Sequence, residues 1–319
     1  MTVDPLRHAP PAVIVDSEVD SWSKALTSKP EVDGTISAVL VVKAGFSIDD
    51  GELRPLGKAK SVEPADKWDG EPGLSNLAAA GEVATPSERR QCYVLGEVST
   101  PARGSTPVDI GLRFDLNSGR HERMVTVTPP GRWKSSLGFR RPAFEPWSGE
   151  PLAIDWALAY GGVCPVTGLY HPENPAGCGF RTRGRPDEGE AVPRFHPAGQ
   201  VWSRPGQETQ AAGLGPMPVR REGDSFRAPA EQCFDGEWQA GETLELIGLT
   251  GNQSGRVEAL ELPSFRPRPV LMQGRHGQPL AGRVDTLVVD SAAGTLSLLW
   301  RCAFSFRPVA DPIRVVIVE

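Results

Sequence analysis

Residues 35–48 read TISAVLVVKAGFSI, and this stretch decides the fold class of the chain. It contains a continuous apolar run at residues 39–42, and β-branched residues are frequent throughout. Branched side chains pack well on a pleated sheet and lose rotamer freedom in a helix. The turn-forming triplet Asp49-Asp50-Gly51 follows at once. The sequence therefore predicts a buried strand, and a second short strand over residues 53–59 that completes a hairpin.

Further strand-like segments lie on both sides of a long irregular middle. Residues 91–98, 108–114 and 121–128 have strand composition and predict, with the opening hairpin, an antiparallel sheet made of hairpins. After the middle, strands are predicted at residues 242–249, 256–262, 269–272, 283–289, 295–304 and 313–318, with a hairpin turn at 290–294.

Two segments are less regular. Residues 74–80 are read as one helical turn within a polar loop. Residues 151–160 are read as a strand, because apolar residues alternate from Leu152 to Leu158.

Composition supports an all-β interpretation. The chain has 319 residues with 35 glycines and 31 prolines, and both residue types disfavour helices. We expect a mainly β fold, an antiparallel sandwich or barrel-like core with a long irregular Gly/Pro-rich middle segment. Residues 1–319 are expected to form a single domain, with N-terminal strands at about 35–160, a loop-rich middle at about 161–241 and C-terminal strands at about 242–319.

Charge and cysteine usage exclude several classes of function. The formal net charge is −6, which argues against nucleic acid as a partner, since such binding needs clustered Lys and Arg. The five cysteines are odd in number and widely spaced, as is typical of reduced thiols in the cytoplasm. No stretch is long and apolar enough to predict a signal peptide or a membrane span. We therefore expect a cytoplasmic protein with no membrane partner.

The middle segment contains residue types that bind metals or act as nucleophiles. Cys164, His171, Cys178 and His196 are the types that zinc prefers, but their spacing matches no zinc motif, so no metal is expected. A cysteine hydrolase is conceivable with Cys178, between two glycines, as nucleophile and His171 or His196 as base. The alternative is that these are packed thiols and loop histidines.

Other enzyme chemistries have weaker support. A carboxylate pair for glycoside hydrolysis would come from Glu145, Asp155 and Glu173, although such residues more often cap helices or face solvent. Residues 213–216 are glycine-rich but contain a proline and open no helix, so they predict a loop and no phosphate site. No catalytic residue and no cofactor is predicted.

Tryptophans lie in or beside the irregular segments. Such residues usually anchor a loop to a sheet, but they are also frequent in binding sites. Trp68, Trp202 and Trp238 are the candidates for partner binding.

The segment 155–180, DWALAYGGVCPVTGLYHPENPAGCGF, joins an aromatic-Gly-Gly turn to an Asn-Pro-Ala-Gly-Cys-Gly-Phe phrase. This resembles the bacterial family known as domain of unknown function 2169. The candidate family-motif residues are Tyr160, Gly161, Gly162, Asn174, Pro175, Gly177, Gly179 and Phe180. Further phrases resemble the family in the same order, at residues 39–46, 69–73, 96–101, 142–152, 212–218, 285–287 and 299–301. The resemblance covers about residues 10–305, except for the stretch 181–212 and a departure at Ser47-Ile48.

The resemblance implies a role in bacterial type VI secretion. Members of the family are expected to act as cytosolic adaptors or chaperones that load an effector, often one with a PAAR domain, onto the spike. No catalytic residues are known for the family, so the resemblance implies a non-enzymatic protein. Two alternatives stay open: a hydrolase or carbohydrate-active enzyme using the Cys178/His171 region, and a structural component of the secretion apparatus. In the adaptor interpretation, residues 155–180 form a tight loop that is an architectural feature and a candidate partner surface.

Overall fold

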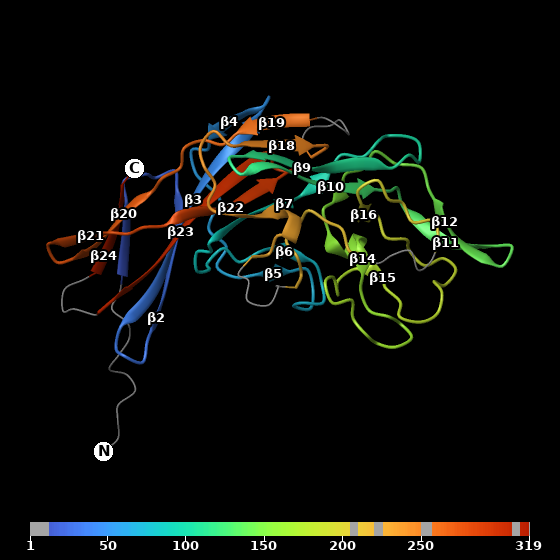
Figure 1. Cartoon of the computed structure of the whole chain (residues 1–319), viewed down its shortest axis with the longest axis horizontal. Coiled ribbons are helices and arrows are strands. Elements are labelled where there is room, and N and C mark those ends of the chain that lie inside the picture. The colour runs from blue at the N-terminus through green and yellow to red at the C-terminus, as the bar shows by residue number, and fades with distance from the viewer. Residues whose placement is uncertain (1–12, 205–209, 220–225, 250–256, 308–312, 319) are drawn as a thin grey trace, which may run out of the picture.

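The computed structural model describes residues 13–204, 210–219, 226–249, 257–307 and 313–318 (Figure 1). Its longest strand is β3 (Ile36–Asp49), which confirms the prediction from the opening stretch. Asp50 and Gly51 both have positive φ angles, 50° and 84°, as a two-residue hairpin turn requires. The chain then returns as β4 (Glu52–Pro55), which pairs with β3 in the predicted hairpin.

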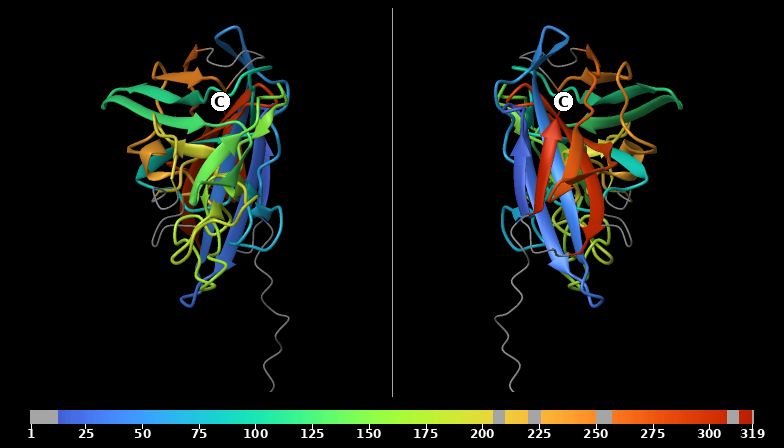
Figure 2. Two further views of the ribbon diagram at one scale, coloured as in Figure 1. Left: turned by 90° about the vertical axis from the view of Figure 1, so that its right-hand side faces the viewer. Right: turned by 90° about the vertical axis from the view of Figure 1, so that its left-hand side faces the viewer.

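The main sheet is built around β3 and joins both ends of the chain. Its order is β17-β7-β22-β23-β3-β2, with β4 also paired to β3. The remaining strands are β2 (Ser23–Pro30), β7 (Arg89–Leu95), β17 (Cys233–Asp235), β22 (Arg283–Asp290) and β23 (Thr295–Phe306). Figure 2 shows the long strands β3 and β23 side by side in the middle of the molecule, where they pair antiparallel.

Both faces of the main sheet are covered. Along β3, Leu40 and Val42 point into the main core, whereas Val41 and Lys43 point to the opposite face. That opposite face is covered by two segments, residues 61–85 and 226–232, which we call the covering layer. A strand that is buried on both faces reads as a continuous apolar run, which explains the sequence of residues 39–42.

Two further sheets pack on the other face. The second sheet has the order β16-β10-β9-β18-β19, and the third has the order β1-β24-β20-β21. The second comprises β16 (Phe195–Pro197), β10 (Gly119–Val127), β9 (Val108–Leu116), β18 (Thr243–Ile247) and β19 (Val257–Glu261). The third comprises β1 (Val13–Ser17), β24 (Ile313–Val318), β20 (Arg268–Gln273) and β21 (His276–Pro279). Leu40, Phe114 and Val315 come from the three sheets and share one core, so the architecture is sandwich-like, with no closed barrel among the described strands.

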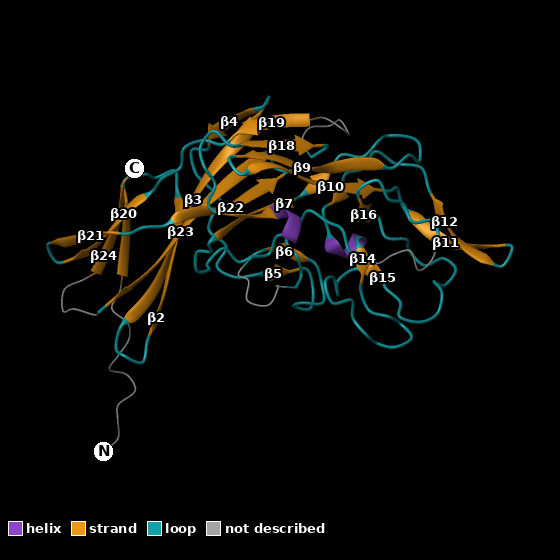
Figure 3. Cartoon of the chain, viewed as in Figure 1, coloured by secondary structure: helices purple, strands orange, loops and turns teal. Residues whose placement is uncertain are grey.

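Short pairs and turns complete the fold. The two-stranded pairs are β5 (Lys67–Trp68) with β6 (Leu77–Ala79), β8 (Glu97–Val98) with β13 (Leu152–Ala153), β11 (Gly131–Ser136) with β12 (Phe139–Phe144), and β14 (Tyr160–Gly161) with β15 (Cys178–Gly179). The described residues include two short 3₁₀ helices, η1 (Trp156–Leu158) and η2 (Ala230–Gln232), while loops gather below β14 and β15 (Figure 3). No helix among the described residues is long and apolar enough to cross a membrane.

The structure corrects three local predictions. Residues 74–80 form no helical turn: β6 begins at Leu77, whose side chain is buried beneath the main sheet. Residues 151–160 form no continuous strand, because Asp155 accepts a hydrogen bond from Ala157 N (2.7 Å) and starts η1. The N-terminal strands do not form one sheet of hairpins: β7 enters the main sheet parallel to β22, whereas β9 and β10 form a hairpin in the second sheet.

Candidate functional site

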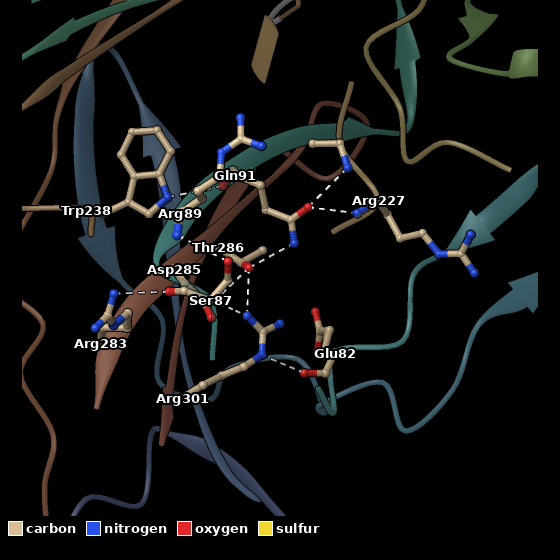
Figure 4. Close-up of polar contacts among 11 residues, drawn as sticks. Glu82, Ser87, Arg89, Gln91, Arg227, Trp238, Arg283, Asp285, Thr286 and Arg301 are labelled. Atoms are coloured by element: carbon tan, nitrogen blue, oxygen red, sulfur yellow. Dashed lines mark hydrogen bonds and ion pairs between the residues drawn. The ribbon is translucent and has the colours of Figure 1, made fainter. Parts of the chain in front are cut away.

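A network of buried charges lies between the main sheet and the covering layer (Figure 4). Arg301 of β23 donates from Nη1 to the Asp285 carboxylate and to Thr286 Oγ1 (2.8 Å). Its Nε donates to the carbonyl oxygen of Glu82 in the covering layer (2.8 Å). Burial raises the pKa of Asp285, although Arg301 beside it acts in the opposite direction.

The same interface holds a second ion pair and an amide bridge. Lys43 Nζ lies 2.6 Å from Glu82 Oε1, and both side chains are buried. Gln91 Oε1 accepts hydrogen bonds from Arg227 N (3.0 Å) and Ala228 N (3.1 Å), and its Nε2 donates to Thr286 Oγ1 (3.1 Å). Each contact joins the sheet to the covering layer or to a neighbouring strand, so the network attaches the layer to the sheet.

The family-motif loop is organised by one buried asparagine. Asn174 Nδ2 donates to the carbonyl oxygens of Trp156 (2.9 Å) and Tyr160 (3.0 Å). The Asn174 carbonyl oxygen accepts a hydrogen bond from Gly162 N (2.7 Å). The strands on either side, β14 and β15, pair in parallel, and Pro175, next to Asn174 in the chain, is buried. The loop is therefore closed on itself by backbone contacts.

The glycines of the motif are required by close backbone approach. Gly162 has a φ of +92°, and a Cβ atom there would lie 2.2 Å from the Gly177 carbonyl oxygen. A Cβ atom on Gly161 would lie 2.1 Å from the Asn174 carbonyl oxygen, and one on Gly177 would lie 2.4 Å from Asn174 Nδ2. Gly179 also has a positive φ, +85°. A side chain on Gly161, Gly162 or Gly177 would force the loop open, whereas one on Gly179 would be strained by the backbone conformation.

Aromatic rings pin the two ends of the loop. Tyr160 makes edge contacts with His171 (5.3 Å between ring centroids), Phe180 (6.2 Å) and Trp202 (5.4 Å). Trp202 in turn contacts His196 at 4.6 Å. Edge-to-face contacts of this kind fix ring orientation as well as burying apolar area.

The outer turn of this loop presents apolar side chains to solvent. Cys164 N donates to the Leu169 carbonyl oxygen, and Gly168 N donates to the Cys164 carbonyl oxygen, both at 2.8 Å, so the turn is closed. The exposed side chains, which we call the motif-loop patch, are Val163 (45%), Val166 (61%), Leu169 (57%) and Tyr170 (50%). Four large apolar side chains exposed within eight residues are a candidate protein-interaction surface.

A family profile described as "Uncharacterized protein conserved in bacteria (DUF2169)" matches residues 33–222 and 226–301. The chain belongs to the DUF2169 family. Searches of curated proteins and of solved structures found no match. The match includes β3, the motif loop, β22 and β23 as far as Arg301, whereas β2 at the edge of the main sheet precedes it.

Within the described part of this DUF2169 protein, Cys178 forms no side-chain hydrogen bond with either candidate histidine. Burial raises the pKa of Cys178 to about 12, so its thiol stays protonated at neutral pH and is a poor nucleophile. His171 Nδ1 accepts a hydrogen bond from Asn174 N (3.1 Å), and burial lowers the pKa of this imidazole. His196 is buried, its Nε2 lies 3.2 Å from Thr128 Oγ1, and burial lowers its pKa to about 4. One ring nitrogen of each histidine is therefore engaged by a group other than Cys178.

The pKa of Cys164 is shifted downward, in the opposite direction to that of Cys178, and the Cys164 side chain is buried. Hydrogen bonds from the Thr167 and Thr182 hydroxyls lower its pKa to about 5. Its side chain is inaccessible to solvent, so this thiol lies beneath the outer turn rather than at a reactive surface. Within the described ranges, no three His, Cys, Asp or Glu side chains gather in a way that would hold a metal ion.

The three carboxylates considered for glycoside chemistry belong to different local structures. Asp155 caps η1, and burial raises its pKa. Glu145 is exposed at the base of the β11–β12 hairpin, where its N donates to the Pro130 carbonyl oxygen (2.8 Å). Glu173 is exposed on the motif loop.

Of the three tryptophans predicted to bind a partner, two are buried. Trp202 is 4% exposed in the aromatic cluster, and Trp238 is 5% exposed, with its Nε1 donating to the Gln91 carbonyl oxygen (3.1 Å). Trp68 is half-buried, and the Arg227 guanidinium lies over its ring at 5.5 Å from the centroid. Trp202 and Trp238 therefore pack inside the chain, which is the anchoring role that loop tryptophans usually have.

The sequence interpretation missed the buried charges and the exposed patch. Lys43 stands in the apolar run VLVVKAGF and Arg301 in LLWRCAF, and a charge inside a strand that is buried on both faces predicts a buried partner. The patch gave no such signal, because Val163, Leu169 and their neighbours resemble ordinary core residues in sequence.

Proposed function

We propose that this DUF2169 protein is a non-enzymatic adaptor that binds a type VI secretion effector, often one with a PAAR domain, or the spike protein itself. In this proposal it acts in the bacterial cytoplasm and helps load the effector onto the spike. The proposal rests on the resemblance of the motifs to the family and on one observation, the motif-loop patch. An adaptor needs a stable frame that presents an adhesive surface, and the patch is exposed on a loop that is closed by backbone contacts.

The contacts beneath the patch support this proposal. The Asn174 hydrogen bonds and the close-packed glycines restrict the loop before any partner arrives. A preorganised surface loses less conformational entropy on binding than a flexible one. Tyr170 and Leu169 can then bury apolar area against a partner without prior rearrangement.

The hydrolase alternative has no comparable support. Cys178 has a raised pKa, and Asn174 N occupies His171 Nδ1. No observation favours the structural-component alternative over the adaptor. The two hypotheses predict different locations: a structural component would be present in secreted spike complexes, whereas an adaptor would stay in the cell.

The test is co-expression with the effector or spike protein encoded beside this gene, followed by affinity purification and measurement of the dissociation constant. We expect the neighbour to co-purify with the wild-type chain. The variant Leu169→Ser/Tyr170→Ser should bind at least about ten-fold more weakly, because central apolar anchors carry much of the binding energy. Val32→Ser, at a side chain fully exposed elsewhere on the surface, is the matched control and should bind normally. Failure of every neighbouring secretion protein to co-purify with wild type would refute the adaptor function.

A further inference from the structure

The β11–β12 hairpin projects from the end of the molecule opposite the third sheet (Figure 1). Its two-residue turn, Leu137-Gly138, has positive φ angles at both positions, 50° and 80°. Residues directly opposite each other in an antiparallel pair share a face. In the register of this hairpin, Lys134 faces Arg141, and Ser136 faces Phe139.

The two faces of the hairpin have different environments. On one face, Trp133 is 1% exposed and packs into the protein. On the other face, Lys134, Arg141 and Phe139 are exposed, with Phe139 at 65%. Leu137 at the tip is 96% exposed. We call these four residues, Lys134, Leu137, Phe139 and Arg141, the hairpin face.

The charges of the hairpin face are uncompensated. Like charges directly opposite each other across two strands destabilise a hairpin. Neither Lys134 nor Arg141 forms an ion pair with any residue that the structure describes, and residues 131–144 contain no acidic residue. By contrast, Arg140 pairs with Glu188 (3.1 Å) and Arg132 donates to the Gly189 carbonyl oxygen (2.7 Å). Lys134 and Arg141 are thus two adjacent cations without an acidic partner among the described residues, in a chain whose net charge is −6.

We propose that the hairpin face binds a segment of a partner protein in which acidic side chains flank apolar ones. The acidic groups would neutralise Lys134 and Arg141 and relieve their repulsion, while an apolar side chain covers Phe139 and Leu137. Aromatic residues and arginine, the types of Phe139 and Arg141, are enriched in protein interfaces. The proposal rests on the adaptor function for the identity of the partner as a secretion protein, but the chemistry of the face stands by itself.

Side chains, rather than strand addition, mediate this binding. The backbone N–H of Trp133 points away from β12, because it donates to the Glu190 carbonyl oxygen (2.9 Å). The backbone nitrogen of Pro142, which lies directly opposite Trp133, therefore points to the outer edge of β12. Proline has no N–H, so this position cannot donate a hydrogen bond to an added strand.

A protein partner fits better than an anionic membrane or nucleic acid. The exposed carboxylates of Asp187 and Glu188 border the hairpin, where Arg140 Nε donates to the Pro186 carbonyl oxygen (3.2 Å) and Arg140 pairs with Glu188. They would repel closely spaced phosphates, whereas a protein segment can match a mixed pattern of charges.

The probe is a short synthetic peptide with alternating glutamate and leucine, and binding is measured by fluorescence anisotropy with the full-length protein. Two control peptides replace glutamate by lysine or leucine by serine. We expect the Glu/Leu peptide to bind more tightly than both controls, and its affinity to fall as salt is raised. Lys134→Glu/Arg141→Glu should weaken this binding by about ten-fold or more, and Phe139→Ala should weaken it as well.

The matched control is Lys58→Glu/Arg103→Glu, which makes the same charge change at two exposed cations elsewhere and should leave peptide binding unchanged. Lys134→Gln/Arg141→Gln removes the repulsion without introducing carboxylates, so it should keep or raise the melting temperature and still weaken binding.

Equal binding by wild type and the hairpin variants would overturn the proposal, as would binding to phosphatidylglycerol vesicles or duplex DNA but not to the peptide. If the peptide result holds but no neighbouring secretion protein co-purifies, the adaptor function fails and the hairpin face stands. If the neighbour co-purifies and the peptide result fails, only the hairpin face is refuted.

Discussion

The motif loop is held by one side chain, that of Asn174, and by glycines that leave room for it. Asn174 fills the centre of the loop and bonds to four backbone groups, while the glycines let the chain pass within contact distance of it. A loop built in this way depends on the absence of side chains as much as on their presence.

Gly162 and Gly168 give a matched test of this interpretation. Both have positive φ angles, +92° and +71°, but a Cβ atom on Gly162 would overlap the Gly177 carbonyl oxygen, whereas one on Gly168 would meet nothing within 4 Å. Gly168→Ala should lower the free energy of unfolding by about 1 kcal/mol, the cost of the backbone conformation alone. Gly162→Ala should lower it by about 3 kcal/mol or more, because the clash adds to that cost. Urea unfolding would measure both, and equal losses would show that the close approach at Gly162 does not matter.

The sequence identified the residues of the motif loop but could not assign their roles. Glycines, an asparagine and two aromatic residues predict a tight loop with pinned ends, and Tyr160 and Phe180 do contact each other. Trp202 and Trp238 looked like loop residues available to a partner, yet both are buried. Exposure depends on which distant segment covers a residue, and local sequence does not contain that information.

Elements in the main sheet show how a charge can be accommodated in an apolar strand. β3 is buried on both faces, so Lys43 can only be tolerated where a carboxylate of the covering layer meets it. The Glu82 carboxylate also accepts a hydrogen bond from Glu63 N (2.9 Å). The pair therefore attaches the covering layer to the strand at one defined position.

Lys43→Met should lower the free energy of unfolding by about 3–5 kcal/mol, because Glu82 would remain as an unpaired buried charge. Lys43→Met/Glu82→Gln should recover most of this loss, since a neutral amide can still accept the hydrogen bond from Glu63 N. Lys60→Met is the control: the Lys60–Asp290 pair is as close, 2.5 Å, but the Lys60 side chain is 53% exposed, and about 1 kcal/mol or less is expected. Thermal and urea unfolding of the three variants would decide. A Lys43→Met loss no larger than that of the control would contradict the attachment role.

Element positions followed from the sequence better than element partners. The strand predicted at residues 313–318 coincides with β24, and the predicted hairpin of β3 with β4 is confirmed. The parallel pairing of β7 with β22 was not predicted, because pairing across two hundred residues leaves no local trace. The β11–β12 hairpin was missed for a different reason: with only Trp133 fully buried, it shows no alternation of apolar and polar residues.

The N-terminal and C-terminal parts of the chain share the main sheet and the second sheet. β3 and β7 come from the N-terminal part, but β22 and β23 from the C-terminal part lie between them in the main sheet. In the second sheet, β9 from the first part pairs with β18 from the second. Neither part can complete the main sheet or the second sheet by itself, which is why we expect one cooperative unit even though the middle segment consists mostly of loops.

A protease site inserted between Gly184 and Arg185, both exposed, would test this expectation. After cleavage, the two fragments should stay together in size-exclusion chromatography, because β3 pairs with β23 along the whole length of β23, from Thr295 to Phe306. The nicked protein should unfold in a single transition, at lower denaturant than the intact chain, since cleavage removes the covalent link that limits the entropy of the unfolded state. The fragment 1–184 produced alone lacks the two strands that separate β7 from β3, so its apolar strand faces would have no partner and it should be unfolded or aggregated. A folded, monomeric fragment 1–184, or two separate transitions in the nicked protein, would show instead that the chain consists of two independent units.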